Sequence, residues 1–304
     1  MRKQLAGQQG ALAARGQEST EQAHGVRARR RFWNTLLKQK AILIGGSILL
    51  VLLILAAFAP LIVTNDPVRI FTPARLRAPN AYYFFGTDSQ GRDVFARVLY
   101  GARLSLTVGV AASVCTLFFG TLLGLITSYY PRADAVIMRV VDGMMAFPGI
   151  ILAIGIMAVR GASVLNIIIA LTIVSTPRLV RLVRSVVLGL RETAFVEAAI
   201  AIGNRDARIM WRHILPNILS PLIVQTSFLF AEAILAEASL SFLGAGAPPE
   251  IPSWGSMLSD SKNLLQQAPW TMFFPGAALA LTVLGLNILG DGLRDMLDPR
   301  LRQR

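Results

Sequence analysis

The chain has 304 residues, of which 54% are hydrophobic and only 15% are charged. This composition excludes an ordinary soluble domain of that length and indicates an integral membrane protein. The net charge of +13 lies in blocks beside apolar runs, so membrane topology and anionic lipid explain it, and nucleic acid is not expected as a partner.

The N-terminal region divides into three predicted parts. Residues 1–31 are polar and poorly periodic, which predicts a disordered tail, and residues 32–40 follow a run of arginines and predict an interfacial helix. Residues 41–63 carry no charge and are long enough to cross a bilayer. This stretch is too long for the core of a cleaved signal peptide, so we expect it to remain as the first membrane span.

Five further apolar stretches follow. The second span contains a Gly-xxx-Gly spacing at Gly120 and Gly124, which favours close helix packing, and Phe147-Pro148-Gly149 predicts a kink in the third. The sequence therefore predicts an all-α integral membrane protein with six transmembrane helices and an N-terminal interfacial helix. The later spans are expected over residues 104–130, 135–159, 163–185, 218–245 and 270–290.

The distribution of lysine and arginine predicts the orientation of the chain. With the N-terminus in the cytoplasm, 22 of the 30 basic residues fall on the inner side. Cytoplasmic loops carry the excess of basic residues in membrane proteins. Both termini and the loop 190–217 are therefore expected in the cytoplasm, and the loops 64–103 and 246–269 outside it.

Cysteine and histidine are too sparse for a disulfide or a metal site. Cys115 is the single cysteine and lies in an apolar span, while His24 and His213 are far apart in the sequence. No group of these residues has metal-ligand spacing. We therefore expect no bound metal.

The loop 190–217 contains the most distinctive polar segment of the chain. Its first part predicts a short helix with Glu197 beside an apolar stripe, and Gly203 is predicted to turn the chain because glycine tolerates left-handed geometry. Asn204 or Asp206 is then expected to cap a second short helix. The residues of the apolar stripe are Phe195, Ala198, Ala199 and Ile202.

Two interpretations of this segment remain open on physical grounds. An amphipathic helix between spans can lie on the lipid headgroups, or it can dock a partner protein. Pro216 is expected to separate the second short helix from the fifth span.

Ionisable residues inside the spans are candidates for a translocation path or for polar contacts between helices. Arg139 and Asp142 are three residues apart, which favours a local ion pair. Glu232 and Glu237 are expected either to line a cavity or to contact Ser, Thr or Arg of a neighbouring helix. Asn287 is expected to form a hydrogen bond between helices.

The outer loops contain a second group of candidate residues. Turn residues around Gly91 accompany Asp88, Arg92 and Asp93, and Trp254 follows a proline-rich stretch in the last outer loop. These residues are expected either to contact an external partner protein or to form a structural support for the second span.

The order Glu197-Ala198-Ala199, Gly203, Leu215-Pro216 resembles the EAA loop of bacterial ABC-importer permeases, although His213 stands where that pattern usually has an apolar residue. Further motifs extend the resemblance to roughly residues 35–302 and to the C-type subunit of the dipeptide/oligopeptide permease family. These motifs are Gly86-Thr-Asp88, Gly91-Arg-Asp93, Tyr100-Gly-Ala-Arg-Leu-Ser-Leu106, Ala238-Ser-Leu-Ser-Phe-Leu-Gly244, Pro252-Ser-Trp-Gly-Ser-Met-Leu258 and Gly290-Asp-Gly-Leu-Arg-Asp-Met-Leu-Asp-Pro299.

The resemblance implies a type I importer in the bacterial inner membrane, with residues 41–304 as its permease domain. Its expected partners are a second homologous permease, two ABC ATPases that bind ATP and magnesium, and a periplasmic or lipid-anchored peptide-binding protein. Dipeptides or short oligopeptides are the implied substrates, with glutathione or chelated nickel as alternatives. The implied coupling residues are Phe195, Glu197, Ala198, Ala199, Ile202, Gly203 and Asn204, and the implied contacts for the binding protein are Asp88, Arg92, Asp93 and Trp254.

The chain itself is not expected to be an enzyme or to bind ATP, because none of its four lysines is followed by Ser or Thr as a phosphate-binding loop requires. A proton-coupled secondary transporter would use Asp142, Glu232 or Glu237 as proton carriers, but no inverted repeat is evident. A membrane-embedded hydrolase would need a base near a nucleophile, and His24 and His213 are poorly placed for that role.

Overall fold

The computed structural model describes residues 39–297, and every regular element in this range is a helix. Five of these helices are long and apolar enough to cross a membrane, and a sharply bent pair of shorter helices makes a sixth candidate span. The expected all-helical fold is thereby confirmed, with five to six candidate membrane spans. The predicted tail over 1–31 and the interfacial helix, apart from its last two positions, lie outside the described residues.

The first span consists of α2 (Lys40–Ala57) and a single further turn, α3 (Ala59–Ile62). The interruption at Phe58 precedes Pro60, which lacks the N–H needed to continue the first helix. Gly45 brings α2 close to the last helix, since a Cβ there would lie 2.6 Å from the carbonyl oxygen of Gly285. The absence of a side chain therefore allows the two backbones to touch.

The second span, α4 (Val94–Tyr129), begins ten residues earlier than predicted. Asp93 caps it by accepting a hydrogen bond of 2.9 Å from the N–H of Phe95. At 1.5 Å per residue, this helix of 36 residues is about 54 Å long, well beyond the roughly 30 Å of a bilayer core. Residues 63–93 before it form a loop with one short 3₁₀ turn, η1 (Thr72–Ala74).

The third predicted span is not one kinked helix. It consists of α5 (Pro131–Met145) and α6 (Gly149–Arg160), whose axes differ by 94°. Pro148 explains the break, because proline removes a helical hydrogen bond and disfavours helical geometry in the residue before it. The sequence indicated the position of the bend but not its size.

The fourth span, α7 (Val164–Arg191), is followed by the short helix α8 (Ala194–Ala201). The next helix runs from Asp206 to Phe242 through α9 (Asp206–Ile209), a π-helical turn η2 (Met210–Ile214) and α10 (Leu215–Phe242). The predicted separation at Pro216 is therefore wrong, since this residue lies in the first turn of α10, where proline is tolerated. The predicted cap at Asn204 or Asp206 is also wrong, because Arg205 occupies the N-cap position of α9.

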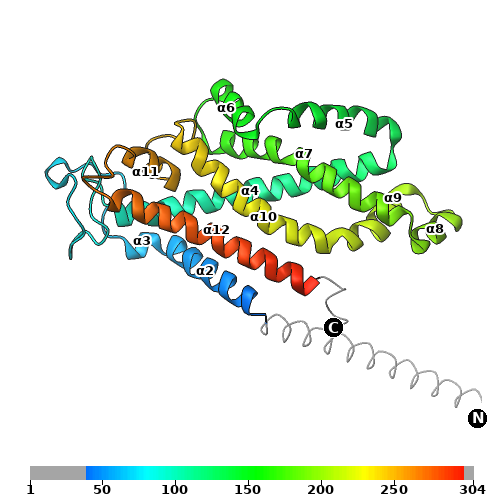
Figure 1. The fold of residues 1–304 in the computed structure, drawn as a ribbon, viewed down its shortest axis with the longest axis horizontal. Helices are drawn as coiled ribbons and strands as arrows, with labels where there is room; N and C mark the ends of the chain where they lie inside the picture. The colour runs from blue at the N-terminus through cyan, green and yellow to red at the C-terminus, as the bar shows by residue number, and fades with distance from the viewer. Residues whose placement is uncertain (1–38, 298–304) are drawn as a thin grey trace, which may run out of the picture.

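The long helices lie side by side, with α4 and α10 in the middle (Figure 1). Three apolar clusters hold the bundle together, and α4 and α10 contribute to all of them. Figure 1 places α8 and α9 at one end of the molecule, and α11 (Trp254–Ser261) with the loop 63–93 at the other. The last helix, α12 (Trp270–Leu297), packs against α2 and α10.

Candidate functional site

The helix α8 has one face buried in the protein and one face exposed. Val196 is fully buried and Ala199 is 4% exposed, and both join the apolar cluster formed by α4, α7 and α10. Phe195 and Ile202 are 43% and 79% exposed. The predicted apolar stripe is therefore partly buried and partly exposed. Residues three apart share a helical face, so Ala199 is buried on the same face as Val196. Ala199 supports the helix from inside and does not present a surface to a partner.

The exposed face of α8 combines apolar side chains with one carboxylate. Glu197 and Ala198 are exposed and follow Phe195 in the sequence, and Ile200 is 52% exposed. Large exposed apolar side chains beside a carboxylate at the tip of a protein are typical of an interaction surface. Both interpretations left open by the sequence, docking of a partner and contact with lipid headgroups, require apolar side chains exposed in this way.

Gly203 ends α8 with a left-handed turn, as the sequence predicted. Its φ is +79°, and its N–H donates to the carbonyl oxygen of Ile200 at 2.9 Å. The N–H of the half-buried Asn204 donates to the carbonyl oxygen of Ala199 at 3.2 Å. These two bonds form a Schellman motif, which satisfies carbonyl groups at the helix end. The glycine thereby fixes where the exposed face of α8 stops.

The end of α7, just before α8, is tied to the end of α4. Arg191, the last residue of α7, donates a hydrogen bond to the carbonyl oxygen of Ser128. Its guanidinium also lies 4.8 Å from the ring centroid of Tyr129, within the range of a cation–π contact. These two contacts join the ends of α4 and α7 beside the start of α8.

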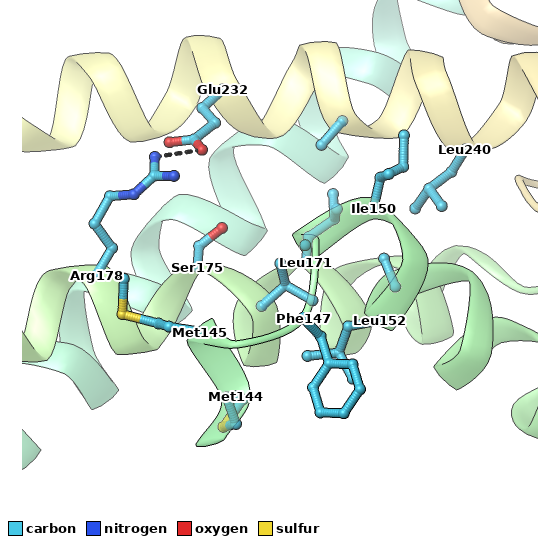
Figure 2. A pocket seen from close by; sticks show the side chains of 14 residues that line it. Met144, Met145, Phe147, Ile150, Leu152, Leu171, Ser175, Arg178, Glu232 and Leu240 are labelled. Atoms are coloured by element: carbon cyan, nitrogen blue, oxygen red, sulfur yellow. Dashed lines mark hydrogen bonds and ion pairs between the residues drawn. The ribbon is translucent and has the colours of Figure 1, made fainter. Parts of the chain in front are cut away.

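A mostly apolar cavity of about 320 Å³ lies between the α5–α6 break, α7 and α10 (Figure 2). Arg178 of α7 donates to Glu232 of α10 at 2.6 Å within it. Glu232 thus fulfils both predicted alternatives, since it lines a cavity and contacts an arginine of a neighbouring helix. The main lining residues are Met144, Met145, Phe147, Ile150, Leu152, Leu171, Ser175, Arg178, Glu232 and Leu240.

Two further ion pairs join α5 to α7. Arg181 contacts Asp142 at 2.5 Å, and Arg184 binds both carboxylate oxygens of Asp134 at 2.7 and 2.8 Å. The predicted local pair of Arg139 with Asp142 is wrong, because α7 packs beside α5 and supplies a closer cation. Arg139 itself is exposed. The spacing of three between the arginines of α7 was the sequence signal for this polar stripe.

Glu237 occupies a different environment from Glu232. It is fully buried and accepts hydrogen bonds from the hydroxyl groups of Ser105 at 2.9 Å and Ser241 at 2.8 Å. The expected contact with serine is confirmed, and cavity lining is wrong for this residue because it joins α10 to α4. Asn287 is half-buried on α12, and its side chain makes no hydrogen bond within residues 39–297.

The residues predicted to contact an external protein are buried instead. Asp88 and Arg92 are each 7% exposed and joined at 2.5 Å, and Arg92 also reaches Asp260 of α11 at 3.0 Å. Arg97 is 2% exposed and lies 3.8 Å from Asp88 and 3.7 Å from Asp260. This four-charge cluster fastens the loop before α4 to α11. The alternative role as a structural support for the second span is therefore the one that the packing favours.

Asp93 and Trp254 belong to the same support. Asp93 caps α4 and accepts a hydrogen bond from the amide of Asn65 at 2.9 Å. Trp254 is fully buried, and its indole N–H donates to the carbonyl oxygen of Val98 at 3.0 Å. The sequence did not indicate that Asp260 and Arg97 complete the cluster, because their contacts join positions far apart in the chain.

Asp88→Ala is expected to destabilise the protein by roughly 3–5 kcal/mol, because it leaves buried cations of Arg92 and Arg97 without their shared carboxylate. The thermal unfolding midpoint of the purified protein measures this effect. Asp260→Ala is the matched control and should lower the midpoint less, since the side chain of Asp260 is 46% exposed. Equal midpoints for the wild type and Asp88→Ala would show that the cluster contributes nothing.

Comparison with known proteins identifies the family. Residues 116–303, more than half of the chain, match the family described as binding-protein-dependent transport system inner membrane component. The chain belongs to this family. Residues 28–79 match the N-terminal transmembrane domain of oligopeptide transport permease C, so the chain is a C-type permease subunit of an ABC transporter and a multi-pass inner membrane protein. This membership excludes the alternatives of a secondary transporter and a membrane-embedded hydrolase.

Several relatives match nearly all of this permease. It is 49% identical to the dipeptide transport system permease protein of Alkalihalophilus pseudofirmus, over 90% of each chain. The probable peptide ABC transporter permease protein of Sinorhizobium fredii is 50% identical over 86% of this chain and 90% of its own. The glutathione transport system permease protein of Pectobacterium atrosepticum is 41% identical over 90% of this chain and 91% of its own.

A solved structure supports the fold of the permease. The methionine ABC transporter MetNI, solved in inward-facing conformations, matches with a TM-score of 0.51 and 20% sequence identity. The match covers 66% of this chain and 94% of the MetNI chain. At this identity the likeness concerns the fold alone, which is that of an ABC-importer permease.

Proposed function

We propose that this permease imports dipeptides or short oligopeptides from the periplasm into the cytoplasm. The observation that carries the proposal is the high identity, over nearly the whole chain, to relatives whose names specify dipeptide or peptide transport. The relative named for glutathione transport is less similar over the same length. Chelated nickel has no support among these relatives and is the weakest of the three substrate classes.

The importer would consist of this chain, a second homologous permease, two ABC ATPases and a periplasmic or lipid-anchored binding protein. ATP and magnesium would bind to the ATPase subunits. The support is the family, which is defined by dependence on a binding protein, together with the unpaired exposed face of α8. Both termini would lie in the cytoplasm, because α8 and the C-terminal end of α12 lie toward the same end of the molecule, opposite to α11 (Figure 1).

The exposed face of α8 would dock into the ATPase subunit. Phe195, Ala198 and Ile202 supply apolar contact, and Glu197 supplies a carboxylate for a cation of the partner. Gly203 and Asn204 end the helix at the required place. Closure of the ATPases would then move α8. The burial of Val196 among α4, α7 and α10, and the contact of Arg191 with Tyr129, would transmit this movement to those helices during alternating access.

Uptake by the purified complete importer in proteoliposomes tests the proposal. With ATP supplied to the ATPase side and the binding protein on the other, we expect accumulation of labelled dipeptide that excess unlabelled dipeptide abolishes. Glutathione or nickel chelate should need at least about tenfold higher concentrations than the dipeptide for the same inhibition, which corresponds to a difference of about 1.4 kcal/mol in binding free energy. ATP-dependent accumulation of glutathione or nickel without any dipeptide uptake would disprove the proposed substrate class.

A further inference from the structure

The ion pair of Arg178 with Glu232 lies at a depth in the helix bundle where charged side chains are costly unless something stabilises them. Arg178 is at the midpoint of α7, about 20 Å from either end of the helix. Ionisable side chains at membrane depth face a cavity or a partner because lipid cannot solvate them. The side chains of Arg178 and Glu232 are 64% and 45% exposed in the chain. The pair is therefore presented to the cavity and is not packed away between helices.

The geometry of this pair differs from that of the neighbouring pair on α7. Arg184 binds Asp134 through two hydrogen bonds, and both side chains are at most one-third exposed. Arg178 uses one nitrogen to contact one oxygen of Glu232. The remaining N–H groups of Arg178 and the second carboxylate oxygen of Glu232 have no partner within residues 39–297. Arg184 and Asp134 thus use both carboxylate oxygens in their contact. Arg178 keeps N–H donors, and Glu232 keeps a carboxylate oxygen, that can bind a further molecule.

The rest of the cavity is apolar and adaptable. Figure 2 shows the ion pair toward one end of the cavity, Ile150 and Leu240 toward the other, and Met144 and Met145 along one side. Methionine side chains are unbranched and adapt to different shapes, which suits surfaces that accept varied partners. The volume of about 320 Å³ is near the lower end of the roughly 300–1,000 Å³ typical of small-molecule sites.

We propose that Arg178 and Glu232 form a subsite for the two charged ends of a short peptide. Arg178 binds the peptide carboxylate, Glu232 binds the α-ammonium group, and the methionine-lined side receives the variable side chains. The subsite has no net charge. A dipeptide with free termini and uncharged side chains has none either, so its binding leaves no uncompensated charge in the membrane interior. This inference rests on the proposed import of peptides and adds a selection step within the permease for free peptide ends.

Thiol protection tests the subsite without relying on the selectivity of the binding protein. Ser175 lines the cavity, and Cys115 is the chain's single cysteine, so Ser175→Cys in a Cys115→Ser background places one reporter thiol beside the ion pair. The matched control is Ser185→Cys in the same background, since Ser185 is exposed on α7 but does not line the cavity. The complete permease and ATPase complex, without binding protein, is treated with a charged thiol reagent, and modification of this chain is followed by mass spectrometry.

An unmodified dipeptide is expected to slow labelling of the Ser175→Cys variant and to leave the Ser185→Cys variant unchanged. N-acetyl and C-amide dipeptides should need roughly tenfold higher concentrations for half protection, the effect of one lost charge-assisted hydrogen bond. Adding Glu232→Gln should remove the difference between free and N-acetyl dipeptide only. Adding Arg178→Gln should remove the difference between free and C-amide dipeptide only.

Equal protection by free and blocked dipeptides beside the intact ion pair would overturn the subsite, as would an absence of protection by any of them. Uptake assays on the same importer, with ATP and the binding protein, separate this failure from failure of the proposed function. Normal dipeptide uptake without selective protection disproves the subsite alone. Absence of uptake for every dipeptide and oligopeptide disproves peptide import itself.

Discussion

Gly203→Pro is expected to reduce peptide uptake to the background level while the permease still inserts into the membrane. Proline holds φ near −65° and cannot adopt the +79° of this position. It also removes the N–H that donates to Ile200 and disfavours the helical geometry of Ile202 before it. The exposed face of α8 would then lose its fixed end. Co-purification of the ATPase subunits and uptake in proteoliposomes measure the effect.

Gly203→Asn is the matched control, because asparagine adopts left-handed geometry at lower cost than other residues with side chains. A Cβ at this position would meet no atom within 4 Å, so the substitution introduces no overlap within residues 39–297. We expect most of the uptake to remain. If the proline variant transported peptide as well as the asparagine variant, the proposed coupling role of this turn would be incorrect.

Gly91→Ala is expected to destabilise the protein strongly, although glycine and alanine differ by a single methyl group. The φ of Gly91 is +75°, and a Cβ there would lie 1.9 Å from the carbonyl oxygen of Phe71. Left-handed strain and overlap with backbone together give a loss of roughly 3–5 kcal/mol. The overlap cannot be relieved by rotation of a side chain, and Gly91 adjoins the buried Arg92. A large fall in the unfolding midpoint of the purified protein is the expected result.

Gly161→Ala separates the two contributions to this loss. Gly161 has a φ of +82°, but a Cβ there would meet nothing within 4 Å. Only the strain of about 1–2 kcal/mol should remain in this variant. Similar midpoints for the Gly91 and Gly161 variants would mean that the loop around Phe71 moves aside easily and does not support α4.

The features that sequence predicted well depend on neighbouring residues. The uncharged run of α2, the position of the break at Pro148 and the turn at Gly203 all follow from local chemistry, and the structure has each of them. The exposed face of α8 was predicted only in part, because Ala199 of the predicted stripe is buried together with Val196. The expected substrate class came from the resemblance to a known family, and neither the periodicity nor the composition of the chain predicts it.

The features that sequence missed depend on contacts between distant segments. Arg97 and the charges beside it looked like an outer loop, yet they are buried because Asp260 from another helix partly compensates them. This is why α4 begins ten residues earlier than predicted. In the same way, Asp142 has a nearby cation within its own helix but contacts Arg181 instead. The periodicity of one helix does not indicate which other helix packs against it, so it cannot predict an ion pair between two helices.

The contact of α2 with α12 joins the two ends of the described chain. Gly45 fits against backbone atoms of Gly285 and Leu289, which the ribosome adds long after α2 has been made. During synthesis the first span is therefore in the lipid before its main neighbour exists, and the apolar residues of α2 after Lys40 are compatible with that environment. A chain that stops before α12 keeps only the smaller contact of this first helix with α4. The first helix therefore reaches its full set of neighbours only when the last helix is inserted.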